Sequence, residues 1–252
     1  MSWSLATLLL VFAAFFLSMA VYGLRGRRRD ADADSKHAQF LGGLGDFVLH
    51  WFLWLVDPAA RLSIRLGLSA DFYNFAGLAF GAAAGLAVAA GQLEIGGWAV
   101  VLSGVCDILD GRIARALRVT SRYGAFIDSL LDRFIELFFF VGFAFFARHT
   151  THGAVAATLA LGSSVLVSYA RAMGESLGVE CTGGLMQRGE RLALLSLGCL
   201  ADRSLSAALG QPTGTVLTAV AYFIGVTSLL TAVHRTVWIS RRLRAEPPPA
   251  GK

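Results

Sequence analysis

The sequence has few charged residues and an excess of apolar ones. Only 15% of its 252 residues are charged and 56% are hydrophobic, whereas about a quarter of the residues in soluble domains are charged. This composition excludes an ordinary cytosolic enzyme, an intrinsically disordered chain and a collagen-like fibre. It predicts a membrane protein that crosses the bilayer several times.

Cysteine and lysine are also scarce. Three widely separated cysteines without a CxxC pair exclude a disulfide scaffold and argue against a zinc site. Lysine occurs only at Lys36 and Lys252, so the net charge of +5 comes from arginine. These arginines flank apolar runs, which indicates membrane orientation and not a nucleic acid partner.

Long apolar runs make up most of the chain. A bilayer span needs about 20 mostly apolar residues. Asp202 and Arg203 interrupt the sixth candidate span, which makes it the weakest. The candidate spans are 3–23, 70–91, 95–116, 124–147, 153–173, 191–209 and 214–239.

The arginines predict how these spans are oriented. No basic segment precedes the first span, and the arginine cluster 25–29 follows it, which favours an uncleaved anchor over a signal peptide. If that cluster is cytosolic, the arginines at 241–244 are cytosolic too, and only Arg148 and Arg203 lie outside. We therefore expect a cytosolic C-terminus.

The remaining segments complete the predicted organisation. In 44–66, apolar residues recur at i, i+3, i+4 and i+7 from Val48, which is typical of an amphipathic helix. That helix either lies at the cytosolic interface or packs half-buried on the bundle. We expect an anchor and polar linker over 1–43, a membrane domain over 44–240 and a disordered cytosolic tail over 241–252.

Carboxylates inside spans are the strongest functional signal, because each costs roughly 2.5–3.5 kcal/mol to insert. Asp107 and Asp110 are spaced i, i+3, while Gly124, Asp128 and Asp132 line one face of the next helix. A short connection makes the two helices antiparallel neighbours, so four carboxylates face each other. Hard oxygen ligands suit Mg²⁺ or Mn²⁺, and two ions about 3.5–4 Å apart can clamp a phosphoryl group. The alternative is a network of structural ion pairs.

Small residues continue the faces that carry the aspartates. Gly111, Ala114 and Gly124 would let a bulky ligand approach the backbone closely. Arg115 lies one position beyond, where a guanidinium can hold a diphosphate. The predicted site therefore combines metal ligands with a diphosphate-binding surface.

The order of these residues resembles the signature of the CDP-alcohol phosphatidyltransferase family. All eight specified positions match in Asp107-x2-Asp110-Gly111-x2-Ala114-Arg115-x8-Gly124-x3-Asp128-x3-Asp132. The resemblance extends over about residues 45–240 and implies an all-α bundle of six spans preceded by an interfacial helix. The anchor at 3–23 lies outside it.

The resemblance implies a reaction and a role for each matched position. Family members transfer a phosphatidyl group from a CDP-linked lipid, here CDP-diacylglycerol, to a small polar alcohol and release CMP. By position, Asp107, Asp110 and Asp128 would bind two Mg²⁺ or Mn²⁺ ions. Asp132 would complete the metal site and act as the base for the acceptor hydroxyl. The CDP moiety would contact Gly111, Ala114, Arg115 and Gly124.

The acceptor is less constrained by the sequence. Arg171, Arg188 and Arg191 match basic residues that bind an anionic acceptor in the branch making inositol-phosphate lipids, although Met173 replaces one basic residue of that branch. Inositol phosphate is the expected acceptor, with glycerol 3-phosphate and free inositol as alternatives, and interface anchoring as the alternative role of the arginines. The segment 68–74 lacks the proline and threonines found in many relatives, which leaves its contribution to nucleotide binding open.

Two other function classes also use membrane carboxylates. An intramembrane prenyltransferase usually places its aspartate pairs on well-separated helices, and a cation transporter usually places carboxylates at the membrane midplane in repeated halves. Neither matches the pattern here. Gly81 and Gly85 belong to a GxxxGxxxG face that predicts close helix packing within the bundle, although relatives often form homodimers.

Overall fold

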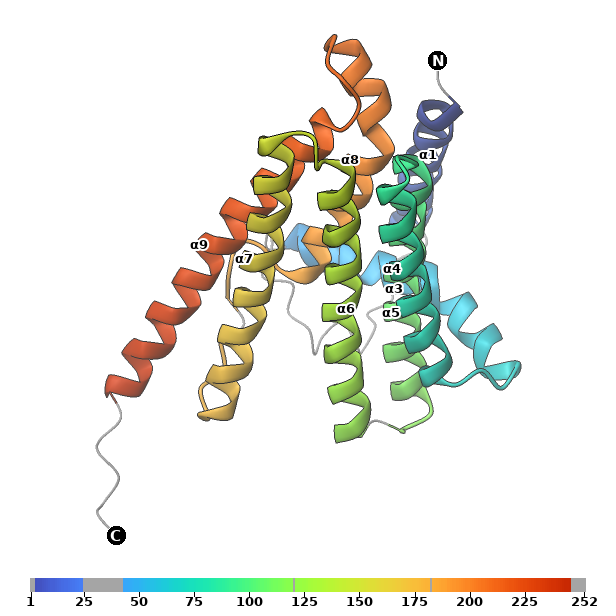
Figure 1. Cartoon of the computed structure of the whole chain (residues 1–252). Helices are drawn as coiled ribbons and strands as arrows, with labels where there is room; N and C mark the ends of the chain where they lie inside the picture. Colours follow the sequence, from blue (N-terminus) through green and yellow to red (C-terminus); the bar gives the residue numbers. More distant parts are fainter. Residues whose placement is uncertain (1–2, 25–42, 120, 182, 246–252) are drawn as a thin grey trace. The chain divides into compact units, whose positions relative to one another are not determined.

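The computed structural model describes residues 3–24, 43–119, 121–181 and 183–245, and within them it contains helices and turns but no strand (Figure 1). This confirms the all-α prediction. The predicted linker lies outside the described residues except for Gly43. The eight described helices are α1 (Trp3–Leu24), α3 (Gly43–Arg65), α4 (Ala70–Ala89), α5 (Leu93–Ala116), α6 (Arg122–Phe146), α7 (Thr151–Ser176), α8 (Arg188–Ala208) and α9 (Thr215–Ala245).

The weakest predicted span, α8, is an intact helix, and the charge that interrupts it has a structural role. Asp202 is fully buried. Its carboxylate accepts hydrogen bonds from the backbone N–H groups of Gly214 at 2.6 Å and Leu217 at 2.8 Å. These donors lie at the start of α9, where N–H groups lack partners within the helix. Asp202 therefore caps the next helix from inside the protein.

The prediction of a disordered tail from residue 241 is wrong for its first residues. Helix α9 continues through Ala245, and the rest of the predicted tail lies outside the described residues. Arginine is a good helix former, and the guanidinium of Arg242 lies 5.0 Å from the centre of the Trp238 ring. This cation–π contact supports the last turns of the helix.

Three of the described helices, α4, α7 and α9, are long and apolar enough to cross a membrane. Helices α5, α6 and α8 have 24, 25 and 21 residues, but charged side chains interrupt their apolar sequence. In α1, the shorter stretch Ala13–Leu24 is apolar. The charges in α5 and α6 include the predicted site residues.

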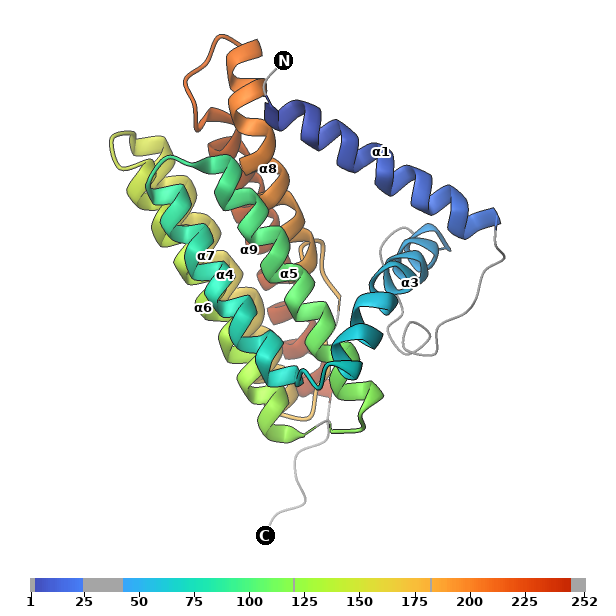
Figure 2. The same cartoon turned by 90° about the vertical axis from the view of Figure 1, so that its right-hand side faces the viewer.

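The chain divides into two compact units. The first contains residues 1–77 and 105–129. Its core is formed where α3 packs on the second half of α5, through Val56, Ala60, Leu109 and Ile113. Helix α1 contacts α3 (Figure 2), and the Trp51 indole donates a hydrogen bond to the Ser18 hydroxyl at 3.1 Å.

The second unit contains residues 78–104 and 130–252. Its core includes Phe139, Phe140 and Phe143, and α9 packs against both α7 and α8. A Cβ atom on Gly85 would collide with the backbone of Phe138 in α6. Glycine is therefore required for this close helix contact, as the prediction of packing within the bundle expects.

Candidate functional site

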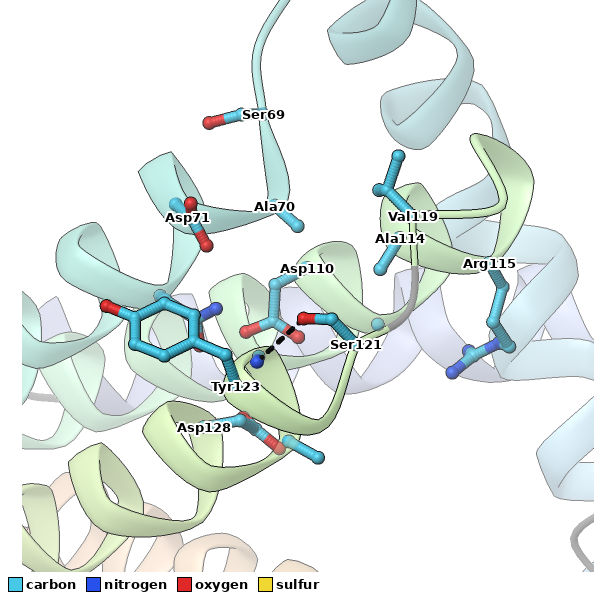
Figure 3. A pocket seen from close by; sticks show the side chains of 14 residues that line it. Ser69, Ala70, Asp71, Asp110, Ala114, Arg115, Val119, Ser121, Tyr123 and Asp128 are labelled. Carbon is cyan, nitrogen blue, oxygen red and sulfur yellow. Dashed lines mark hydrogen bonds between the residues drawn. The ribbon is translucent and has the colours of Figure 1, made fainter.

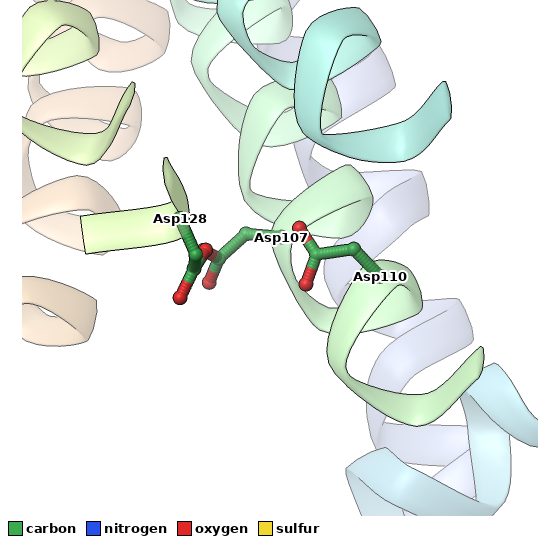
Figure 4. A group of neighbouring side chains, drawn as sticks. All are labelled: Asp107, Asp110 and Asp128. Atoms are coloured by element: carbon green, nitrogen blue, oxygen red, sulfur yellow. The ribbon is translucent and has the colours of Figure 1, made fainter. Parts of the chain in front are cut away.

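Three of the four predicted metal-ligating aspartates come together. Asp107 and Asp110 extend from α5, and Asp128 extends from the second turn of α6 (Figure 4). One carboxylate oxygen from each lies within 4.8 Å of the other two. Asp110 is buried, and the other two are half-buried. The i, i+3 spacing on one helix and the short connection to the next helix thus produce the predicted cluster.

A tight reversal between α5 and α6 makes this convergence feasible. The N–H of Val119 donates to the carbonyl of Ala114 at 3.0 Å, and Arg118 adopts a left-handed conformation with φ of 56°. That conformation costs an arginine about 1–2 kcal/mol relative to the right-handed one. The Ser121 hydroxyl then accepts a hydrogen bond from Gly124 N–H at 3.0 Å and caps α6.

A cavity of about 370 Å³ lies beside the aspartates in the same unit (Figure 3). This volume falls within the usual range of small-molecule sites, about 300–1,000 Å³. Asp110 and Asp128 line the cavity, so it adjoins the aspartate cluster. All four residues predicted to contact CDP also line it, namely Gly111, Ala114, Arg115 and Gly124.

Gly111 keeps the cavity wall open. A Cβ atom at this position would lie 3.1 Å from Nη1 of Arg115. A larger side chain would therefore compete with the guanidinium for space at the wall. The predicted close approach of a ligand to the backbone of α5 depends on this glycine.

The start of α4 also forms part of the cavity wall. Ser69, Ala70, Asp71 and Asn74 line the cavity from the start of α4. These residues belong to the segment that lacks the proline and threonines of many relatives, and they nevertheless line the cavity. Polar side chains spaced i, i+3 at the start of an apolar span were the available signal. Val119 and Ser121 line the cavity from the α5–α6 reversal, and Tyr123 and Ala125 line it from the first turn of α6.

The fourth aspartate has a different partner. Asp132 lies one turn beyond Asp128 on α6, and its Oδ1 atom is 2.6 Å from Nη2 of Arg188. Both side chains are largely buried, at 13% and 16% exposure. The metal-binding and base roles of Asp132 stay predictions, while its ion pair with a predicted acceptor-binding arginine is part of the structure.

The three predicted acceptor arginines lie in distinct environments. Arg188 pairs with Asp132, whereas Arg191 is fully buried and donates to Glu136 from Nε at 3.0 Å and from Nη2 at 2.6 Å. Arg171 is half exposed and pairs with Glu175 on its own helix at 2.7 Å. Two of the three therefore join α8 to α6, which the sequence pattern did not reveal.

The loop before α8 is anchored to α9. The Thr231 hydroxyl accepts hydrogen bonds from the N–H groups of Leu185 and Met186, each at 3.1 Å. Arg235 donates from Nε to the Gly183 carbonyl at 2.9 Å and from Nη1 to the Val167 carbonyl at 3.0 Å. These contacts fix the start of α8, and with it Arg188.

The chemistry of the aspartate cluster fits a hard divalent cation. Carboxylate oxygens are the ligands that Mg²⁺ and Mn²⁺ prefer. Three like charges within 4.8 Å repel one another, so a cation among them relieves repulsion as well as gaining ligands. A neighbouring cavity with an arginine on its wall suits a phosphorylated ligand bound to that cation.

Comparison with known proteins points to one family. The chain is 34% identical over 189 residues to the archaetidylinositol phosphate synthase of Methanothermobacter thermautotrophicus, covering 75% of this chain and 90% of that protein. It is 35% identical over 205 residues to the phosphatidylinositol phosphate synthase of Streptomyces avermitilis, covering 79% and 83%.

Solved structures agree with the sequence matches. The phosphatidylinositol phosphate synthase of Mycobacterium tuberculosis with CDP-DAG bound superposes with a TM-score of 0.65 at 26% identity, covering 78% of this chain and 97% of that one. The same enzyme in complex with manganese and citrate also gives 0.65, covering 78% and 92%. The CDP-alcohol phosphatidyltransferase family profile matches residues 70–241. The chain is therefore a membrane enzyme that belongs to the CDP-alcohol phosphatidyltransferase family.

Proposed function

We propose that this enzyme transfers a phosphatidyl group from CDP-diacylglycerol to an inositol phosphate and releases CMP. The observation that carries the proposal is the cavity that adjoins the aspartate cluster and is lined by every predicted CDP-contacting residue. The M. tuberculosis relative binds CDP-DAG in a crystal structure that matches 78% of this chain. Two curated relatives are inositol phosphate lipid synthases.

Asp107, Asp110 and Asp128 would hold the divalent cations, with Asp132 completing the set. Mg²⁺ or Mn²⁺, when bound, neutralises the diphosphate and stabilises the departing CMP. The donor set fits, because all three clustered ligands are carboxylates whose oxygens lie within 4.8 Å of one another. Manganese in the crystallised M. tuberculosis relative supports the same assignment.

The protein groups around the cavity would orient the donor. Gly111, Ala114 and Gly124 would leave room for the nucleotide diphosphate against the backbone. The Arg115 guanidinium would donate two parallel hydrogen bonds to a phosphate. At the start of α4, Asp71 and Asn74 offer hydrogen-bonding groups for the polar edge of the nucleotide. Held in this way, the scissile phosphorus is presented to the acceptor in one orientation.

Asp132 would accept the proton of the acceptor hydroxyl. Its ion pair with Arg188 would hold the carboxylate in place, so that it aligns the hydroxyl with the phosphorus. Arg188 would contact the phosphate of the acceptor while it remains beside Asp132. Arg191, locked to Glu136, would support this arrangement by fixing α8 on α6.

The membrane arrangement extends the same proposal. Helices α4 to α9 would form a six-span core with the site and the C-terminus facing the cytosol. Helix α3 would lie at the cytosolic interface, and α1 would be an additional anchor. The apolar character of α4, α7 and α9 and the distribution of arginines support this topology.

The proposal is tested by CMP release from the purified protein. The protein is given CDP-diacylglycerol, Mg²⁺ or Mn²⁺, and one acceptor chosen from inositol 1-phosphate, inositol, glycerol 3-phosphate and serine. Metal-dependent CMP release with inositol 1-phosphate alone is the expected result. CMP release with glycerol 3-phosphate alone would support the proposed reaction but show that glycerol 3-phosphate, and not inositol phosphate, is the acceptor. No CMP release with any acceptor would contradict the proposal.

Replacing Gly111→Val is expected to weaken donor binding. If the steric cost to the bound donor is about 1–3 kcal/mol, similar to that of overpacking a core, the KM for CDP-diacylglycerol should rise about 5- to 150-fold. The matched control is Gly104→Val on the same helix, because a Cβ atom there meets nothing within 4 Å. Equal KM values for the two variants would show that Gly111 does not contribute to donor binding.

Replacing Arg188→Gln is expected to affect the acceptor more than the donor. A hydrogen bond to a charged group is worth about 1.5–3 kcal/mol, so the KM for inositol 1-phosphate should rise roughly 10- to 100-fold. Arg203→Gln, at an exposed position of the same helix, serves as the control. A KM change confined to CDP-diacylglycerol would assign Arg188 to the donor.

A further inference from the structure

Helix α3 lies outside the segment matched by the family profile, yet it supports the helix that carries the aspartates. The profile match begins at residue 70. Val56 and Ala60 of α3 pack on Leu109 and Ile113 of α5, and Ile113 is fully buried. This contact lies within the turns of α5 that present Asp107 and Asp110.

An ion pair joins the same two helices. Nη2 of Arg112 lies 2.9 Å from Oδ1 of Asp57, across 55 residues of sequence. The Arg112 side chain is only 11% exposed. Arg112 follows Asp110 by two residues, which places it about 200° round the helix at 3.6 residues per turn. Helix α3 therefore holds α5 on the side opposite the aspartates.

Helix α3 also contacts the helix that forms another wall of the cavity. The hydroxyl oxygens of Ser63 and Tyr73 are 2.6 Å apart and share a hydrogen bond. Tyr73 belongs to the first turns of α4, between the wall residues Asp71 and Asn74. One helix thus has polar contacts with two of the helices that line the cavity.

We propose that Asp57 and Arg112 are positioning residues for the metal site, so that α3 contributes to metal binding by holding α5 in place. This inference rests on the proposed function. Apolar packing alone has no direction and tolerates rotation or sliding of one helix on another, whereas a charge-assisted hydrogen bond has a defined geometry. Metal ligands from two helices must be held within about 0.5 Å of their productive positions. The Asp57–Arg112 pair fixes the rotation of α5 that brings Asp107 and Asp110 to Asp128.

The chain provides a matched control for this pair. Arg61 binds the other oxygen of the same carboxylate, with Nη2 of Arg61 2.7 Å from Oδ2 of Asp57. However, Arg61 belongs to α3 itself and its side chain is 67% exposed. Its ion pair therefore does not connect α3 to α5, and its removal leaves the position of the aspartates unchanged.

The test is a Mn²⁺ titration of the purified protein. Binding is measured from the decrease in the electron paramagnetic resonance signal of free Mn²⁺. The Mn²⁺ affinity of Asp57→Asn and Arg112→Gln should fall by about tenfold or more, the range seen when groups supporting metal ligands are removed. The Mn²⁺ affinity of Arg61→Gln should equal that of the wild type. Arg112→Lys, which retains the charge, should recover part of the loss.

A charge exchange separates positioning from a general loss of stability. Asp57→Arg combined with Arg112→Asp, in an Arg61→Gln background, restores an attractive pair between α3 and α5. If the charge-exchanged protein and Asp57→Asn have the same thermal unfolding midpoint, the exchanged protein should still bind Mn²⁺ more tightly. Wild-type affinity in Asp57→Asn and Arg112→Gln would overturn the inference, and so would an exchanged protein that binds no better than the single variants. Absence of Mn²⁺ binding and CMP release in the wild type would instead contradict the proposed function.

Discussion

Replacing Asp110→Asn should reduce metal-dependent CMP release by about a thousandfold or more, because a bound cation supplies several kcal/mol of transition-state stabilisation. Asp110 is the buried member of the three-carboxylate cluster and also lines the cavity. The amide keeps the size of the side chain and removes its charge. The measurement is the CMP release rate at saturating Mn²⁺ and CDP-diacylglycerol.

Glu94→Gln is the matched control for this prediction. Glu94 lies in the first turn of the same helix and is absent from both the cluster and the cavity wall. Its variant should keep the wild-type rate. The thermal unfolding midpoint of Asp110→Asn in the presence of a chelator should not fall, since one of three mutually repelling charges is removed. Wild-type CMP release by Asp110→Asn would contradict the proposed metal site.

The second large effect is expected for Asp132→Asn. General base catalysis contributes about 10²–10⁴-fold, so kcat should fall within that range. The clustered carboxylates are intact in this variant, so its Mn²⁺ affinity should fall less than that of Asp110→Asn. Steady-state kinetics with inositol 1-phosphate, together with a Mn²⁺ titration, gives both values.

Loss of the ion pair with Arg188 must be separated from loss of the base. Arg188→Gln breaks the same 2.6 Å contact while keeping the carboxylate. Its kcat should therefore stay far above that of Asp132→Asn, although its acceptor KM rises. Equal kcat values in the two variants would mean that the ion pair, and not proton acceptance, explains the effect of Asp132.

Local spacing was sufficient to predict that Asp107, Asp110 and Asp128 form a cluster and that small residues of the two helices lie beside it. Asp107 and Asp110 share a helix face at i, i+3, and the short reversal to Asp128 allows only an antiparallel neighbour. The helix itself therefore determines which side chains meet. The same reasoning placed Gly111 and Gly124 beside the ligand, and both line the cavity. The family match excludes the prenyltransferase and transporter hypotheses.

Contacts between residues far apart in sequence could not be predicted. Glu136 and Arg191 are 55 residues apart, and nothing in either local pattern identifies the other. Asp202 looked like an interruption of α8 because its partners, the N–H groups that begin α9, are defined only by the fold. The arginines from 241 onward resembled a polar tail, although arginine and a nearby tryptophan also extend a helix.

The most direct test of the central claim is anomalous diffraction from crystals grown with Mn²⁺ and CDP-diacylglycerol. We predict manganese peaks between the carboxylates of Asp107, Asp110 and Asp128, with the diphosphate in the adjoining cavity beside Arg115. Manganese bound elsewhere, or a donor diphosphate outside this cavity at saturating Mn²⁺, would contradict the account.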